Sequence, residues 1–176
     1  DGAAEEPEVV DLANFLNKMG AKISGAGTNR IVIEGVKELH GAEHGIIPDR
    51  IEAGTFLIAG AIAGKSVTIN RVNPDHLTAV LEQLREAGYC LDIGTNQITV
   101  SPNGANHPVQ LDTQPYPGFP TDMQAQFMVL NAIAKGASKV TETIFENRFM
   151  HVNELVRLGA HIQIDGKVAV LEGVQK

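Results

Sequence analysis

The sequence contains no tryptophan and only one cysteine, and aromatic residues make up 5% of it. A single cysteine cannot form an intramolecular disulfide and suits a reducing cytoplasm, where we expect this protein. Long apolar runs are absent too: the longest, Phe56 to Gly64, is far shorter than the roughly 20 residues that span a bilayer. The acidic start, DGAAEEPEVV, fits neither a signal peptide nor a transit peptide, so no membrane partner is expected.

Positive charge is also scarce. The chain has 14 Lys and Arg residues and 21 Asp and Glu residues, which gives a net charge of −7, and the cations form no cluster in the sequence. This excludes nucleic acid as the main partner, because phosphate backbones are bound by basic surfaces. An anionic small ligand would have to be held by a few arginines and by helix N-termini. Among the six histidines only His40 and His44 are closely spaced, so we expect neither a metal nor a cofactor.

The 176 residues, 43% of them hydrophobic, contain a repeat. Three segments, starting at Val9, His76 and Val152, each predict an amphipathic helix, a small-residue stop and two short strands. The stops are Gly20-Ala21, Ala87-Gly88 and Gly159-Ala160. In the first segment, GAGTNR at Gly25 resembles part of a phosphate-binding loop, but it follows a helix and precedes a strand. It is therefore predicted to be a hairpin turn.

A second element recurs between these segments. PDRIEAGTFLIAGAIAGKSVTINRV, from Pro48, and PTDMQAQFMVLNAIAKGASKVTETIF, from Pro120, predict an Ala-rich helix that is buried nearly all round and then a strand. Together the elements predict an α/β (α+β) fold of β-α-β-α-β-β units, with VQLDTQPYPGF giving the opening strand of the last one. Residues 1–45 hold only the end of one unit, and residues 46–176 hold two units. This incomplete set is expected of one part of a larger protein.

Both recurring helices begin with an acid. Asp49 is predicted to cap its helix, with Glu52 three residues on, while Arg50 opposes the helix dipole and is expected to pair with an acid or an anionic ligand. Thr121 and Gln124 match the capping-box pattern, which puts Asp122 in the first turn. Asp122 thus has two possible roles: a carboxylate that stabilises the helix start, or one that accepts a proton.

The segment IFENRFMHVNEL places Glu146 and Arg148 between a strand and a helix, where open α/β proteins bind ligands. A structural Glu–Arg pair is the alternative. Ile144 and Phe145 are predicted to be core residues. Cys90, in GYCLDIG, has no neighbouring His or Lys that would favour a thiolate, so it is predicted to pack in a strand rather than act as a nucleophile.

Four strings in the chain resemble the enolpyruvyl transferases of bacterial cell-wall synthesis: EPEVVDLANFLNKMGAKISGAGTNRIVIEGV, PDRIEAGTF, FPTDMQAQF and TETIFENRFMHVNEL. The resemblance covers nearly the whole chain. It implies a fold of repeated β-α-β-α-β-β units, with helices inside and sheets outside. It also implies a reaction that moves the enolpyruvyl group of phosphoenolpyruvate to the 3-hydroxyl of UDP-N-acetylglucosamine and releases phosphate.

The resemblance assigns roles to particular residues. Asp122 matches the aspartate that acts as general base on the sugar 3-hydroxyl, and Ile144 matches a position whose backbone contacts the nucleotide-sugar. Asp49, Glu146 and Arg148 match family positions near the cleft and are given supporting roles, and Glu6 matches a family acid near the interdomain region. Arg50, which is expected to pair with an acid or an anionic ligand, is added to this supporting set. Cys90 does not match the family's catalytic cysteine, whose glycine-rich loop has no counterpart in this sequence. A Lys-Asn pair and most phosphate-binding arginines of the family have none either.

We therefore expect the isolated chain to be inactive, with its substrates bound by the intact enzyme. Two alternatives remain: a fragment of the shikimate-pathway enolpyruvyl transferase, and a non-catalytic binding or scaffold module of the same units. With units missing, an exposed apolar helix face is also expected to allow the fragment to form a homo-oligomer.

Overall fold

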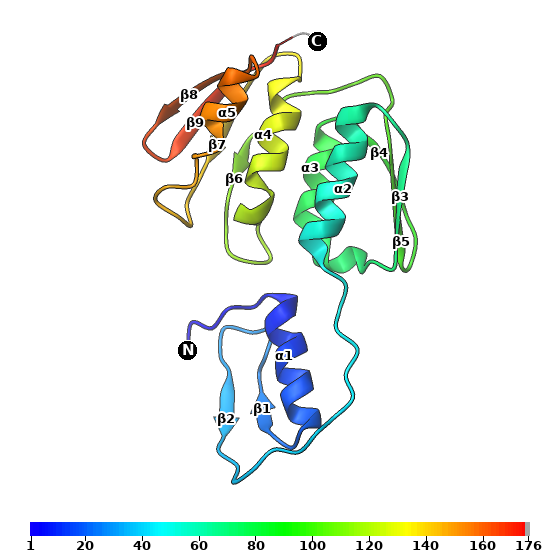
Figure 1. Cartoon of the computed structure of the whole chain (residues 1–176), viewed down its shortest axis with the longest axis vertical. Helices are drawn as coiled ribbons and strands as arrows, with labels where there is room; N and C mark the ends of the chain where they lie inside the picture. Colours follow the sequence, from blue (N-terminus) through cyan, green and yellow to red (C-terminus); the bar gives the residue numbers. More distant parts are fainter. Residues whose placement is uncertain (175–176) are drawn as a thin grey trace. The chain divides into compact units, whose positions relative to one another are not determined.

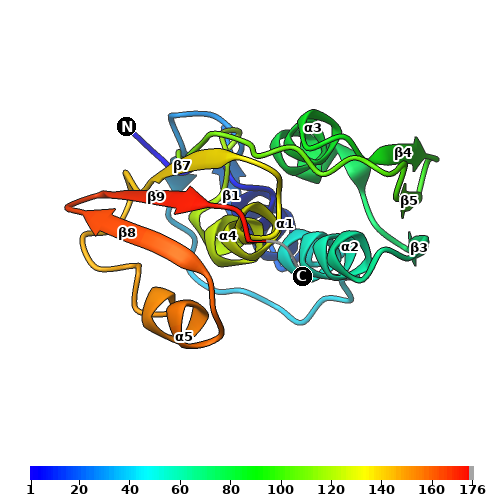
Figure 2. The same ribbon diagram turned by 90° about the horizontal axis from the view of Figure 1, so that it is seen from above.

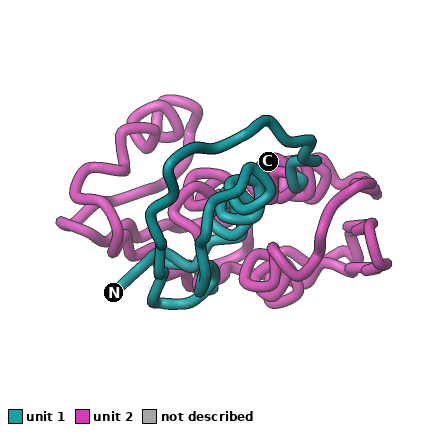
Figure 3. The backbone as a smooth tube through the Cα atoms, turned by 90° about the horizontal axis from the view of Figure 1, so that it is seen from below, with its two compact units in different colours: residues 1–48, 115–117 teal, residues 49–114, 118–176 magenta. Residues whose placement is uncertain are grey.

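The computed structural model describes residues 1–174 of the chain (Figure 1). The chain divides into two compact units, coloured separately in Figure 3. Unit 1 comprises Asp1–Pro48 together with Pro115–Pro117, and unit 2 comprises Asp49–Gln114 together with the residues from Gly118 onward. None of the helices formed by residues 1–174 combines the length and the apolar character that crossing a bilayer requires.

Unit 1 consists of a helix and a hairpin: α1 (Pro7–Lys18), β1 (Lys22–Ser24) and β2 (Val32–Glu34). Pro7 begins α1, where its missing N–H costs no helical hydrogen bond. The side-chain amide of Asn17 bonds both the N–H and the C=O of Ile23 at 2.8 Å, which attaches β1 to the end of the helix. β1 pairs antiparallel with β2, and this confirms the hairpin predicted at Gly25.

The first half of unit 2 begins with a helix rather than a strand. Its elements are α2 (Arg50–Ala63), β3 (Val67–Asn70), the 3-10 helix η1 (Pro74–Leu77), α3 (Thr78–Glu86), β4 (Cys90–Ile93) and β5 (Gln97–Ser101). The strands form an antiparallel sheet in the order β3-β5-β4. Residues 38–49 form no strand, so this half lacks the opening strand of the predicted unit.

The second half of unit 2 contains the whole predicted β-α-β-α-β-β pattern. Its elements are β6 (Leu111–Asp112), the 3-10 helix η2 (Thr121–Met123), α4 (Gln124–Ala132), β7 (Ala137–Thr141), α5 (Val152–Arg157), β8 (His161–Asp165) and β9 (Val168–Glu172). The sheet order is β6-β7-β9-β8. β6 runs parallel to β7, and the other pairs are antiparallel.

The helices α1, α3 and α5 all end in the same backbone geometry. Each is followed by a glycine with a positive φ: Gly20 at 99°, Gly88 at 94° and Gly159 at 101°. The next residue's N–H then bonds the carbonyl five positions earlier, in the pairs Ala21–Leu16, Tyr89–Leu84 and Ala160–Leu155. This is the Schellman arrangement, in which glycine is preferred because it has no Cβ. The three stops predicted from the sequence are confirmed.

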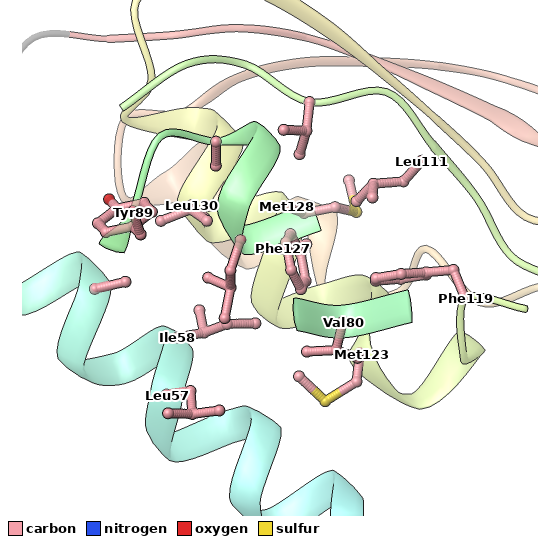
Figure 4. Close-up of a cluster of buried hydrophobic side chains, with 14 of the residues drawn as sticks. Leu57, Ile58, Val80, Tyr89, Leu111, Phe119, Met123, Phe127, Met128 and Leu130 are labelled. Atoms are coloured by element: carbon pink, nitrogen blue, oxygen red, sulfur yellow. The ribbon is translucent and has the colours of Figure 1, made fainter. Parts of the chain in front are cut away.

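The core of unit 2 lies between its two sheets. α2 contacts α4, and each helix also contacts its own sheet: α2 packs on β3 and β5, and α4 on β7 and β9 (Figure 2). A Cβ added at Gly60 would lie 2.6 Å from Cγ2 of Val67, so a glycine there lets α2 approach β3. Phe127 is fully buried within this core and meets Phe119 edge-to-face at 5.1 Å (Figure 4).

The two Ala-rich helices differ in burial. Six of the nine residues of α4 are buried, which agrees with the prediction. The same prediction is wrong for α2, because Phe56 is 55% exposed and Glu52, Ala59 and Ala63 on the same face are exposed as well. Within unit 2, α4 and the β3-β5-β4 sheet cover only the other faces of α2, which therefore keeps an exposed apolar stripe.

Candidate functional site

Asp122 and Arg148 come from distant segments of unit 2 and form an ion pair. Asp122 lies in η2, and Arg148 lies in the loop between β7 and α5. Nη2 of Arg148 donates to Oδ1 of Asp122 at 2.5 Å, while its Nη1 donates to the Thr121 hydroxyl at 3.1 Å. The guanidinium also lies 5.0 Å from the ring centre of Phe145. Because the Asp122 side chain is 53% exposed, the pair presents a carboxylate in a fixed position to solvent.

A second carboxylate, that of Glu142, is buried next to this pair. The residue is 1% exposed and directly follows the last residue of β7. It accepts five hydrogen bonds of 2.7–3.1 Å, from the hydroxyls of Thr113 and Thr121, the side-chain amide of Gln124, and the backbone N–H groups of Ile144 and Phe145. All five of these partners are donors, so the buried negative charge is well satisfied.

The capping box predicted at the start of α4 is wrong. Pro120 occupies the cap position of η2, and no side chain caps η2 or α4. The Thr121 hydroxyl and the Gln124 amide both donate to Glu142 instead. The physical reason is that a buried carboxylate is a strong acceptor that needs donors, and it takes the two groups that a capping box would have used.

Sequence reasoning did not identify Glu142. Glu142 directly follows Thr141, the last residue of β7. A charged residue between two threonines at the end of a buried strand is the signal that could have indicated it. Its hydrogen-bond partners lie up to 29 positions away in the chain, so no local pattern reveals them.

The hydrogen bonds to Glu142 predict a pH dependence of stability. Burial alone would raise its pKa, but the hydrogen bonds from Thr121, Phe145, Ile144 and Thr113 outweigh it, so the pKa lies below its ordinary value of 4.5. Because the pKa is lower in the folded state than in the unfolded state, ionised Glu142 stabilises the fold. This contribution is fully present above pH 4.5 and is lost as the pH falls through the folded-state pKa. We expect the free energy of unfolding to fall below pH 4.5, and to fall less steeply in Glu142→Gln.

Urea unfolding between pH 3 and pH 6 measures this effect. Glu146→Gln is the matched control, because Glu146 is exposed and has no hydrogen bond or ion pair within the described residues. Its pH profile should run parallel to that of the unchanged chain. A Glu142→Gln profile that is also parallel would show that Glu142 makes no pH-dependent contribution to the free energy of unfolding.

Ile144 and Phe145 are not core residues, so that prediction is wrong. They are 38% and 50% exposed. Their N–H groups both donate to Oε1 of Glu142, which fixes the backbone turn while the side chains remain on the surface. Two apolar side chains are thus exposed next to the Asp122–Arg148 pair, where a ligand can contact them.

The remaining candidate residues are distributed over both units. Asp49 caps α2 as predicted, accepting from the N–H groups of Ile51 and Glu52 at 2.8 and 3.0 Å, and Arg50 is the first residue of the helix. α2 contacts η2, and the start of α2 lies at the end of unit 2 where α4 begins (Figure 1). Glu146 is exposed in the loop that holds Arg148, but Arg148 pairs with Asp122. Glu6 lies in unit 1, at the cap position of α1.

His151 and Cys90 make different contributions. His151 lies against Met128, with Nε2 3.2 Å from the sulfur, and burial together with the charge of Arg148 lowers its pKa. The shift favours the neutral imidazole, and Arg148 supplies the positive charge beside Asp122. Cys90 is exposed, so the prediction that it packs is wrong: it is the first residue of β4, an edge strand of its sheet.

This arrangement suits proton transfer next to an anion. An exposed carboxylate can accept a proton from a hydroxyl group, and an arginine can bind a phosphate or a carboxylate. Within residues 1–174, no group of three or more His, Cys, Asp or Glu side chains is placed to hold a metal ion. The structure brings together Asp122, Ile144 and Arg148 from the predicted set, and adds Glu142.

The sequence matches known proteins over its whole length. The family model for EPSP synthase (3-phosphoshikimate 1-carboxyvinyltransferase) matches residues 1–176. The UDP-N-acetylglucosamine 1-carboxyvinyltransferase of Actinobacillus succinogenes is 59% identical over an alignment of 176 residues that covers 99% of this chain and 42% of that protein. This chain therefore spans less than half the length of the curated relatives it matches.

Solved structures share the fold. The enolpyruvyl transferase NikO from Streptomyces tendae superposes with a TM-score of 0.84 at 29% identity, covering 96% of this chain and 40% of that one. The EPSP synthase from Acinetobacter baumannii has a TM-score of 0.63 at 18% identity, covering 92% of this chain and 39% of that one, and shows the fold alone. The chain belongs to the EPSP synthase family, as a homologue of UDP-N-acetylglucosamine 1-carboxyvinyltransferase over part of that protein's length.

Proposed function

We propose that this chain is part of an enzyme that transfers the enolpyruvyl group of phosphoenolpyruvate to the 3-hydroxyl of UDP-N-acetylglucosamine. Phosphate is released, and the product is committed to peptidoglycan synthesis in the cytoplasm. Identity of 59% to a relative named for this activity supports the proposal. The shikimate-pathway activity is supported less, because the EPSP synthase structure shares 18% identity with the chain.

The ion pair between Asp122 and Arg148 is the observation that carries this proposal. The exposed Asp122 carboxylate takes the proton of the sugar 3-hydroxyl, which makes the oxygen a better nucleophile. That oxygen bonds to the carbon of phosphoenolpyruvate that carries the phosphate, while the neighbouring CH2 carbon takes up a proton. Loss of a proton from the resulting CH3 carbon then restores the double bond as the bond from the first carbon to the phosphate oxygen breaks. Arg148 holds the Asp122 carboxylate in place through Nη2, so little reorganisation precedes the proton transfer.

The other residues have supporting roles in this proposal. The exposed turn at Ile144 contacts the nucleotide-sugar through its backbone, next to Asp122. Asp49, Arg50, Glu146 and Glu6 help to shape the cleft of the intact enzyme. Residues 1–45 close one domain, and residues 46–176 are two units of the other domain, whose helices are inside and whose sheets are outside. We expect no activity from the isolated chain, because the catalytic cysteine loop of the family has no counterpart in it.

An amide NMR titration of this chain tests whether unit 2 binds the nucleotide-sugar. We expect saturable shifts at Asp122 and Ile144 with UDP-N-acetylglucosamine and none with shikimate 3-phosphate. The opposite pattern would favour the shikimate-pathway activity. Shifts with neither ligand would mean that the remainder of the enzyme is needed for binding.

If neither ligand shifts the amides of the isolated chain, a hybrid enzyme tests the proposed function. In this hybrid, residues 1–176 replace the matching segment of the Actinobacillus succinogenes relative, which is 42% of its length. Phosphate release that requires both phosphoenolpyruvate and UDP-N-acetylglucosamine supports the proposed function. A hybrid that folds but releases no phosphate contradicts it.

A further inference from the structure

We propose that Glu142 is a positioning residue that fixes the Asp122 turn and the Ile144–Phe145 turn relative to each other. The proposal rests on the function proposed above and deepens it, because it names the group that sets the geometry of both substrate-contacting segments. Glu142 itself is 1% exposed, so it acts through its neighbours rather than by touching substrate.

The two oxygens of Glu142 serve different segments. Oε2 accepts from Thr121 at 2.8 Å and from Gln124 at 2.7 Å, the residues on either side of the Asp122–Met123 pair. Oε1 accepts from the N–H groups of Ile144 at 2.9 Å and Phe145 at 3.1 Å, and from the hydroxyl of Thr113, which directly follows β6. A shift in either segment therefore pulls on the same carboxylate.

A chain of contacts links Glu142 to the Asp122 carboxylate. The Thr121 hydroxyl has one proton, which it donates to Glu142, so its lone pairs remain available to accept from Nη1 of Arg148. Nη2 of the same guanidinium donates to Asp122. Because the Arg148 guanidinium is planar and rigid, the direction of the Thr121 hydroxyl sets the position of Nη2, and with it that of Asp122.

These contacts require a carboxylate rather than an amide. In Glu142→Gln, an NH2 group on the Oε1 side would face two backbone N–H groups. These groups can only donate, so donor would meet donor. On the Oε2 side it would face Gln124, whose amide can turn its unpartnered oxygen toward the new NH2 group. It would also face Thr121, whose hydroxyl can rotate but would then point its proton at Arg148. The amide therefore takes the Oε2 side, so the substitution loosens the Asp122 turn but keeps the hydrogen bonds from the Ile144 and Phe145 N–H groups.

Amide NMR of the whole 176-residue chain tests the link between the two turns. Gln124→Met removes one donor to Oε2, and Gln126→Met is the control, because Gln126 lies on the same helix but donates to Thr55 instead. We expect Gln124→Met to shift the amides of Ile144 and Phe145, and Gln126→Met to leave them unchanged. Shifts confined to the neighbours of Gln124 would overturn the proposal.

A double-mutant cycle in the hybrid enzyme separates positioning from stability. We expect Glu142→Gln to lower kcat by about 10–100-fold when Asp122 is present, since small misplacements of a catalytic group cost this much. In an Asp122→Asn background the further loss should be less than about 3-fold, because residues that act as a unit are not additive. The KM for UDP-N-acetylglucosamine should stay within about 3-fold, because the Ile144 and Phe145 N–H groups keep their acceptor oxygen.

Equal losses in both backgrounds would show that Glu142→Gln merely reduces the folded fraction, and would overturn the positioning role. Full activity in Asp122→Asn alone would instead contradict the general-base role within the proposed function. The two failures are distinguishable, because the NMR test of the link between the turns does not depend on catalysis.

Discussion

Replacing Asp122 by asparagine lowers the turnover of the hybrid enzyme by about 10²–10⁴-fold, the usual contribution of a positioned general base. Asparagine keeps an oxygen that can accept from Nη2 of Arg148, so the geometry of the turn is retained while the proton acceptor is lost. The cost in stability is at most about 1 kcal/mol, because the ion pair is partly exposed to solvent. Turnover is measured as phosphate release at saturating phosphoenolpyruvate and UDP-N-acetylglucosamine.

Asp92→Asn is the matched control for this prediction. Asp92 lies in β4 and is exposed, and its side chain has no hydrogen-bond or ion-pair partner among residues 1–174. The substitution therefore reports on the loss of one negative charge alone. Its turnover should be unchanged. If Asp122→Asn lost stability but not turnover, Asp122 would be a helix-start residue and not a base.

Replacing Phe127 by alanine costs about 3–5 kcal/mol of the free energy of unfolding of unit 2. Phe127 is fully buried in α4, meets Phe119 edge-to-face, and lies within the cluster that fills the space between the two sheets (Figure 4). Truncation removes the buried ring and leaves a cavity that the surrounding helices close only in part. Loss of the aromatic pair accounts for about 0.5–1.5 kcal/mol of this total.

The measurement should follow unit 2 by itself. The chain has no tryptophan to report its unfolding and contains two compact units, so amide resonances of unit 2 in urea are a cleaner probe than total circular dichroism. Phe56→Ala is the control, because the same ring on α2 is 55% exposed, and it should cost less than about 1 kcal/mol. Similar losses for both variants would mean that Phe127 is not at the centre of the core.

Features that depend on local backbone geometry were predictable from the sequence. The three glycine stops and the Asp49 cap each rely on residues within about one helical turn, and all four form as expected. The order of helices and strands in the second half of unit 2 follows from the same local signals. Asp122 and Arg148 could also be named as candidates, because acids and arginines at the ends of strands and helices are recognisable.

Features that depend on partners far away in the chain were not predictable. The capping box failed because Glu142 competes for both of its side chains. Ile144 and Phe145 were assigned to the core because they are apolar, yet the loop that contains them turns outward after β7 ends. The exposed stripe of α2 has a similar origin, since burial of a helix face depends on which other elements are present to cover it.

The repeated glycine stop has a consequence for how this chain tolerates insertions and deletions. The helices before the stops have 12, 9 and 6 residues, yet each leads into a hairpin through the same backbone turn. The differences are close to the 3.6 residues of one helical turn, so a gain or loss at the start of the helix keeps roughly the same face inward. Length can thus vary at the helix start without changing the register of the strands that follow.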